Sequence, residues 1–165
     1  MSRISRTTVI LLAAGLVLAG CATPGKRLPE GDETWGFGPS DGEWPAKLIY
    51  GLEETDIVSL GFTCVPRSGV ATVMVFVGDD ERTWPDRLRL QSGSESQTLN
   101  LVPPAESDVP VVEASINAAS PVATAFASTG RLTSVLYDVH RRVDARGDSQ
   151  RRDVEAFWRV CAKRP

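Results

Sequence analysis

The stretch that decides the fold is residues 57–77, which read IVSLGFTCVPRSGVATVMVFV. The first half alternates apolar with small or polar residues, which predicts a strand whose inward face consists of Val58, Leu60, Phe62 and Cys64. The second half, 70–77, is apolar and β-branched on both faces, as is typical of a central strand. Residues 66–69, PRSG, supply a turn between them. The sequence therefore predicts an antiparallel hairpin at the centre of the core.

Four further runs of similar character predict strands at 87–91, 97–102, 109–117 and 131–139. Most are short and separated by turn residues, which favours a meander. The run at 131–139 also fits helical spacing through Leu132, Val135 and Val139, but its alternation from Thr133 to Val139 favours a strand. We therefore expect a mainly β domain, an antiparallel sandwich or small barrel of about six to eight strands.

Two helices are expected to interrupt and end this domain. The first is short, with Ser120 as its N-cap, proline at its first position and Gly130 closing it. The second follows Asp148 or Ser149 as cap and runs nearly to the end of the chain. Its spacing of i, i+3, i+4 and i+7 predicts one apolar stripe, formed by Val154, Phe157, Trp158 and Cys161. This helix is expected to pack on the sheet.

The first twenty residues have the order of a bacterial export signal. Arg3 and Arg6 precede an uncharged stretch, 7–23, whose apolar run ends at Gly20. A membrane-spanning helix needs roughly 20 apolar residues, so this run is too short to be one. Its last four residues, LAGC at 18–21, resemble the lipobox of bacterial lipoproteins. The alternative is an ordinary secretory signal with a cysteine nearby.

The lipobox resemblance implies a lipid anchor. In that family the chain is cut between Gly20 and Cys21, the Cys21 thiol carries diacylglycerol and its freed amine is usually acylated. Each buried methylene contributes about 0.8 kcal/mol, and two or more chains hold a protein stably on a membrane. Membrane lipid is therefore an expected partner through Cys21. Ala22, in place of aspartate, favours the outer membrane under enteric-type sorting, facing the periplasm.

These signals divide the chain into three parts. We expect a signal peptide at 1–20, a lipidated N-terminus and flexible tether at 21–43, and a single β-rich domain at 44–165. The tether is predicted from its glycine, proline and acidic content, although its aromatic residues are expected to pack back onto the domain.

Only Cys64 and Cys161 remain once Cys21 is lipidated. An even number of cysteines in an exported domain favours a disulfide, and this pair is the one intramolecular pairing available. Cys64 lies on the inward face of its predicted strand and Cys161 on the apolar stripe of the final helix. The alternative is two free buried thiols.

The charge of the chain argues against nucleic acid as a partner. Without Arg3 and Arg6, sixteen basic and twenty-one acidic residues remain, a net charge of −5. The distribution is uneven, because residues 131–165 hold nine lysines or arginines against five acidic residues. Such a pattern is usually a solvated face, and contact with anionic lipid is the alternative.

Familiar catalytic and metal-binding patterns are not convincing in this sequence. Residues 38–42, GPSDG, fit the G-x-S-x-G string of serine hydrolases, but they lie in the predicted tether and contain a proline. The one histidine, His140, is expected to be an exposed strand-end residue. The acidic cluster 79–81 lacks the spacing of a calcium loop and is expected to be a solvated hairpin tip. We therefore predict no catalytic residue, metal or cofactor.

The body of the chain is similar to small exported proteins of proteobacteria, through Trp44-Pro45, Tyr50-Gly51, residues 54–56, Cys64 and the final helix. That resemblance implies no functional residues. The leading hypothesis is a non-catalytic binding or structural role in the cell envelope, with an envelope protein or a peptidoglycan-associated partner. One alternative is a periplasmic inhibitor of a wall-degrading enzyme, by analogy of fold. Another is an enzyme whose carboxylates converge only in the fold.

Overall fold

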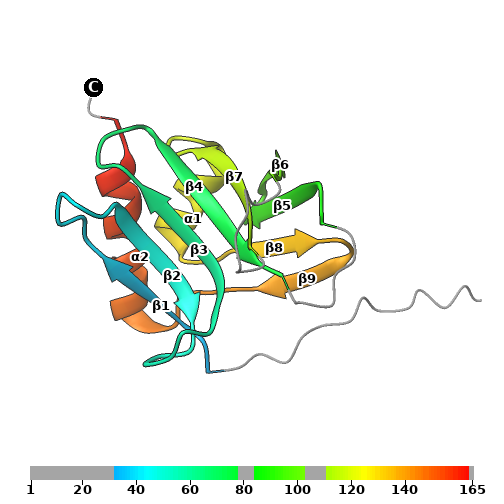
Figure 1. Cartoon of the computed structure of the whole chain (residues 1–165), viewed down its shortest axis with the longest axis horizontal. Coiled ribbons are helices and arrows are strands. Elements are labelled where there is room, and N and C mark those ends of the chain that lie inside the picture. Colours follow the sequence, from blue (N-terminus) through cyan, green and yellow to red (C-terminus); the bar gives the residue numbers. More distant parts are fainter. Residues whose placement is uncertain (1–31, 78–83, 103–110, 164–165) are drawn as a thin grey trace, which may run out of the picture.

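The chain folds into two antiparallel sheets and two helices (Figure 1). The computed structural model describes residues 32–77, 84–102 and 111–163, and the statements below concern these residues. The five-stranded sheet has the order β1 (Thr34–Gly38), β2 (Ala46–Gly51), β3 (Val58–Cys64), β4 (Val70–Phe76) and β7 (Val111–Asn117). The four-stranded sheet has the order β6 (Glu95–Asn100), β5 (Arg87–Ser92), β8 (Thr133–Leu136) and β9 (Val139–Arg142).

This architecture confirms the mainly β prediction. The nine strands in the described residues are consistent with a sandwich, and no closed barrel forms among them. The predicted signal peptide with Cys21, the first part of the predicted tether and the acidic cluster at 79–81 lie outside the described residues.

The predicted core hairpin is present as β3 and β4. Phe62 pairs with Val73 in the antiparallel register, and both side chains are fully buried. The turn between the strands places Gly69 at a φ of 78°, a left-handed conformation that glycine adopts without strain. The alternation of 57–65 therefore specified which face of the sheet meets the core.

Helices α1 (Pro121–Thr129) and α2 (Gly147–Cys161) lie on one face of the five-stranded sheet (Figure 1). The caps of α1 are those predicted, with the Ser120 side chain accepting from the Ala123 N–H and Gly130 in a left-handed conformation. The predicted cap of α2 is wrong, because the N-cap is Arg146. The Gln150 side chain turns back and accepts from the Arg146 N–H at 2.9 Å, which starts the helix earlier.

The end of α2 is fastened to the β3–β4 hairpin. Cys64 and Cys161 form the predicted disulfide, with their Cα atoms 5.8 Å apart. The hairpin turn also caps the helix, since the Arg67 and Gly69 amides each donate at 2.9 Å to the terminal carbonyls of Val160 and Cys161. The covalent link and the hydrogen bonds together hold the helix against the sheet.

An aromatic cluster fills the space between the sheet and the helices. Phe62 lies at its centre, and its ring centroid is 5.3–6.2 Å from those of Trp35, Phe126, Phe157 and Trp158. The Trp158 indole N–H is buried and has no hydrogen-bond partner among the described residues. This cluster joins both helices to the sheet in one continuous core.

The folded domain begins earlier than predicted. Residues 34–38, assigned to a flexible tether from their composition, form edge strand β1, which pairs with β2 from Thr34↔Gly51 to Gly38↔Lys47. Trp35 is only 2% exposed and Phe37 is partly buried, as expected for aromatics that pack back, whereas Trp44 is 68% exposed. The tether assignment is therefore wrong from Thr34 onward, because pairing with β2 gives this short segment a buried face.

The predicted strand at 131–139 is also corrected. It divides into β8 and the first residue of β9, with a reversal between Leu136 and Val139. Tyr137 has a φ of 43°, which breaks the extended backbone. The resulting hairpin brings residues 139–142, which were not predicted as a strand of their own, onto the edge of the four-stranded sheet.

Candidate functional site

A charged concave surface lies where β9 leads into α2. Cross-strand pairing places Thr133 opposite Arg142 and also beside Gln91, so these three side chains form a row across β5, β8 and β9. His140 pairs with Val135 in the next row on the same face, because successive residues on one side of a strand are two apart. This outward face of the sheet is the floor of the site.

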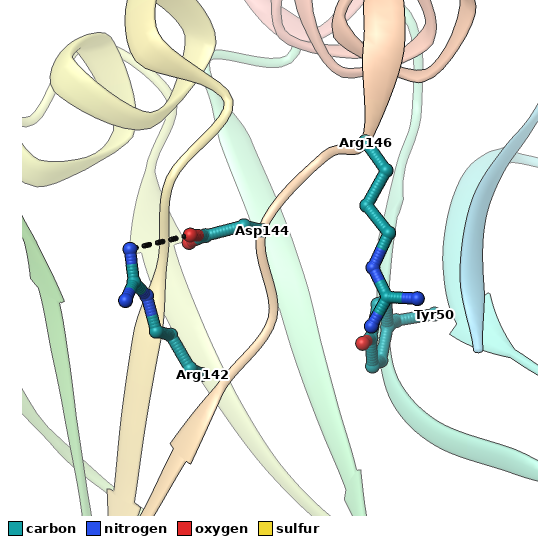
Figure 2. Close-up of a pocket in the computed structure, with 4 residues that line it drawn as sticks. All are labelled: Tyr50, Arg142, Asp144 and Arg146. Carbon is teal, nitrogen blue, oxygen red and sulfur yellow. Dashed lines mark ion pairs between the residues drawn. The ribbon is translucent and has the colours of Figure 1, made fainter. Parts of the chain in front are cut away.

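Two adjoining depressions open on this surface, and we call them together the arginine groove. The first, of about 240 Å³, is lined by Tyr50, Arg142, Asp144 and Arg146 (Figure 2). The second, of about 380 Å³, is lined by Gln91, Gly93, Arg131, Leu132, Thr133, His140, Arg142 and Asp144. Arg142 and Asp144 line both depressions, so their ion pair stands at the boundary between them.

The arginine groove has an excess of positive charge. Among the described residues that line it, there are three arginines, Arg131, Arg142 and Arg146, and one carboxylate, that of Asp144. The Arg142 guanidinium pairs with Asp144 at 2.9 Å, and its side chain remains 61% exposed. Figure 2 shows the Arg146 side chain extending toward Tyr50 from the start of α2. Guanidinium groups bind carboxylates and phosphates in a bidentate manner, so the surface is suited to an anionic ligand.

A partly buried ion pair lies behind the groove. Arg141 lies on the opposite face of β9 from Arg142 and pairs with Glu33, whose other carboxylate oxygen accepts from the Ser59 hydroxyl. The Arg141 guanidinium also lies 5.9 Å from the centre of the Tyr50 ring, which is within the range of a cation–π interaction. Through these contacts β9 of the small sheet is held against β2 and β3 of the large sheet and the residue that precedes β1.

Replacing Glu33 by alanine is expected to destabilise the domain by about 1–3 kcal/mol, because Arg141 and Ser59 both lose their buried acceptor. Partial exposure of the Arg141 side chain keeps the effect below that of a fully buried pair. Urea unfolding measures the change. Glu53→Ala is the control, since Glu53 is exposed and its loss is expected to cost less than about 0.5 kcal/mol. Equal effects of the two substitutions would contradict the importance of the buried pair.

The hydrolase-like string at 38–42 has a structural role. It connects β1 to β2, and the chain after it enters a strand rather than the helix that a nucleophile elbow requires. The Ser40 hydroxyl donates to the Trp44 carbonyl at 2.7 Å, and the Asp41 carboxylate accepts from the Glu43 and Trp44 amides. The hydrogen bond from the Trp44 amide lowers the pKa of Asp41 below its ordinary value. These contacts form a capped turn.

The other residues considered in the sequence are placed as follows. Cys64 and Cys161 form the disulfide described above. His140 is exposed, as predicted, and it also lines the second depression of the arginine groove. Within residues 32–77, 84–102 and 111–163, no three histidine, cysteine, aspartate or glutamate side chains gather as metal ligands. The helices in the same residues are too short or too polar to cross a bilayer.

The arginine groove itself was not predicted. The sequence carried one signal for it, the surplus of basic residues in 131–165, which was interpreted mainly as a solvated face. Searches against protein-family models, curated proteins and solved structures found no match to this chain.

Proposed function

We propose that this chain is a lipid-anchored protein of the bacterial cell envelope with a non-catalytic binding role, and that the arginine groove is its binding surface. The observation that carries the binding role is the concentration of three arginines and a histidine around one carboxylate in two joined depressions. The expected partner presents carboxylates or phosphates, as envelope proteins and wall components do. The anchor is supported by the lipobox-like residues at 18–21.

The binding role is tested by retention of the membrane-extracted protein on heparin beads, a general polyanion, during a salt gradient. Replacing Arg131, Arg142 and Arg146 together by glutamine is expected to weaken binding by at least about tenfold, which corresponds to about 1.4 kcal/mol. The matched control replaces Arg152, an exposed residue of α2 outside both depressions, by glutamine. If the triple variant elutes at the same salt concentration as the control, the groove is not the binding surface.

The anchor is tested by the intact mass of the same material. A chain that begins at Cys21 and carries the mass of acyl chains supports the proposal, and a Cys21→Ser variant is expected to lose that mass and to leave the membrane fraction after extraction with salt. A wild-type chain that begins elsewhere, without added mass, would contradict the lipid anchor.

A further inference from the structure

We propose that the arginine groove belongs to a broader basic face, and that this face docks on anionic phospholipid at the surface of the membrane that anchors the chain. The inference rests on the proposed function, because it names the partner of the same surface and uses the anchor at Cys21. The basic face is the outward side of the four-stranded sheet. It consists of the outward residues of β5, β6, β8 and β9, together with Arg131, two residues before β8.

The alternation of the strands concentrates arginines on this face. Both leucines of β5 are buried, so Arg87 and Arg89, which alternate with them, point outward. The register of β5, β8 and β9 places Arg142 on the same side as Arg89. These three arginines and Arg131 are all exposed. The small sheet therefore presents four guanidinium groups to one side, of which Arg87 and Arg89 lie outside both depressions of the groove.

The carboxylates near this face lie at its borders. Glu95 is the one acidic residue within the four strands, and it pairs with the buried Ser92, so its register assigns it to the other side. Asp86, Asp138 and Asp144 lie at the ends of strands. Two of them form ion pairs with arginines of the face, at 3.9 and 2.9 Å, in which the arginine side chain is more than half exposed. Such exposed pairs are weak, so both guanidinium groups can also bind a lipid phosphate.

The charge of the whole chain makes this face directional. Without the predicted signal peptide the chain carries a net charge of −5, so the surface outside the basic face has an excess of negative charge. An anionic bilayer therefore attracts the basic face and repels the remainder of the domain. This asymmetry favours one orientation on the membrane, with the four-stranded sheet toward the lipid.

The anchored end of the chain enters the domain beside this face. Glu33, at the start of the described domain, pairs with Arg141, the neighbour of Arg142 in β9. Cys21 precedes the first described residue, Asp32, by eleven positions, a length of chain that spans at most about 40 Å when fully extended. The anchor thus holds the basic face at a high effective concentration near the bilayer surface. Acyl chains and a basic patch are the two signals that together give stable membrane attachment.

The test is modification by phenylglyoxal of the mature, lipidated chain in two kinds of vesicle, one of phosphatidylcholine alone and one that also contains about one-third phosphatidylglycerol, an anionic lipid. Peptide mass spectrometry gives the rate at each arginine. The rates at Arg89, Arg131 and Arg142 are expected to be at least about threefold lower in the anionic vesicles. The rate at Arg152, an exposed residue of α2 outside the basic face, is expected to be equal in both. Equal rates at the face arginines would overturn the docking.

A double variant tests the part of the face that lies outside the groove. Each arginine near an anionic surface contributes about fivefold in affinity, so Arg87→Gln with Arg89→Gln is expected to return the remaining face arginines to their rates in phosphatidylcholine. The matched control, Arg152→Gln with Arg159→Gln, removes the same charge from α2 and is expected to keep the protection. Unfolding midpoints equal to that of the wild type exclude loss of the fold. Equal effects of the two double variants would overturn the assignment to this face.

Salt and free phosphate distinguish a charged bilayer from other sources of protection. At about 1 M salt, charges more than about 3 Å apart are largely screened, so the protection is expected to disappear. Glycerol phosphate in solution, at the concentration of the lipid phosphate, is expected to give no protection, because its phosphates are not held on one surface. Protection that persists in high salt, or that glycerol phosphate gives equally, would overturn docking on the bilayer.

Failure of this inference differs from failure of the proposed function. If heparin binding depends on the groove but the anionic vesicles give no protection, lipid docking is overturned, and an acidic envelope protein or wall component remains as the partner. If the heparin test fails, the groove falls as a binding surface. If the intact mass shows no acyl chains, the same modification is measured after the unanchored chain is added to the vesicles, and equal rates in both kinds would again overturn the docking.

Discussion

Replacing Cys64 and Cys161 together by alanine is expected to lower the free energy of unfolding by about 4–5 kcal/mol. The link joins residues separated by 97 positions, so it restricts most of the described domain in the unfolded state. In the chain-entropy model a loop of about 100 residues gives a stabilisation near 4.7 kcal/mol, which is a large part of the 5–15 kcal/mol typical of a whole domain. Urea unfolding of the oxidised wild type and of the double variant measures the difference.

The native position of α2 is expected to survive this change. The Arg67 and Gly69 amides still donate to the carbonyls at the end of the helix, and the Phe157 and Trp158 rings remain in the core. The near-ultraviolet circular dichroism of the double variant is therefore expected to resemble that of the wild type. Reductant added during unfolding serves as the control, since it should bring the wild type to the midpoint of the variant and leave the variant unchanged. A loss of less than about 1 kcal/mol in the free energy of unfolding would contradict a large stabilising role for the disulfide.

The parts of the fold that could be predicted are those whose pattern is complete within one segment. The alternation at 57–65 defines β3, and the stripe from Val154 to Cys161 defines α2, because each face is visible in consecutive residues. The two cysteines then connect these two elements. The cap residues of α1, Ser120 and Gly130, were equally local signals. Such features do not depend on knowing which distant segment lies opposite.

The parts that could not be predicted depend on distant partners. Strand β1 is five residues long and contains Gly36 and Gly38, which have low strand propensity, so only pairing with β2 makes it a strand. The division of 131–139 depends on Tyr137 adopting a positive φ, for which the sequence has no glycine as a signal. Local composition alone therefore misassigned both segments.

The arginine groove could not be predicted for the same reason. Its lining residues come from β2 of one sheet, from β5 and the turn after it, and from the segment 131–146 that contains the β8–β9 hairpin. Residues as far apart in the sequence as Tyr50 and Arg146 therefore lie on one surface. In the sequence Tyr50 and Gln91 carry no motif, and Arg142 is one basic residue among nine in the last thirty-five. The excess of basic residues in 131–165 pointed to the region of the groove. Predicting the concave surface itself would require knowing the register in which β5, β8 and β9 pair.

Replacing Trp35 by alanine is expected to destabilise the domain by about 3–5 kcal/mol, the range found when a large buried aromatic is truncated. The side chain is 2% exposed, and its ring centroid lies 5.1–6.0 Å from those of Tyr50, Phe62 and Phe126. The substitution leaves a cavity where β1, β2 and α1 meet. Urea unfolding measures the loss, and a change below about 0.5 kcal/mol would mean that residues 34–38 are a tether, as their composition first indicated.

Trp35→Phe separates the two contributions of this side chain. The indole N–H donates to the Val143 carbonyl at 2.9 Å, a buried hydrogen bond that spans 108 positions and joins the first strand to the segment between β9 and α2. Phenylalanine keeps most of the ring volume but leaves that carbonyl without its donor, which costs about 1–3 kcal/mol. Trp44→Ala is the matched control, because Trp44 is 68% exposed and its removal is expected to change stability by less than about 0.5 kcal/mol. An order of effects from Trp35→Ala through Trp35→Phe to Trp44→Ala would place the start of the folded domain at β1, directly beside the segment that carries the arginine groove.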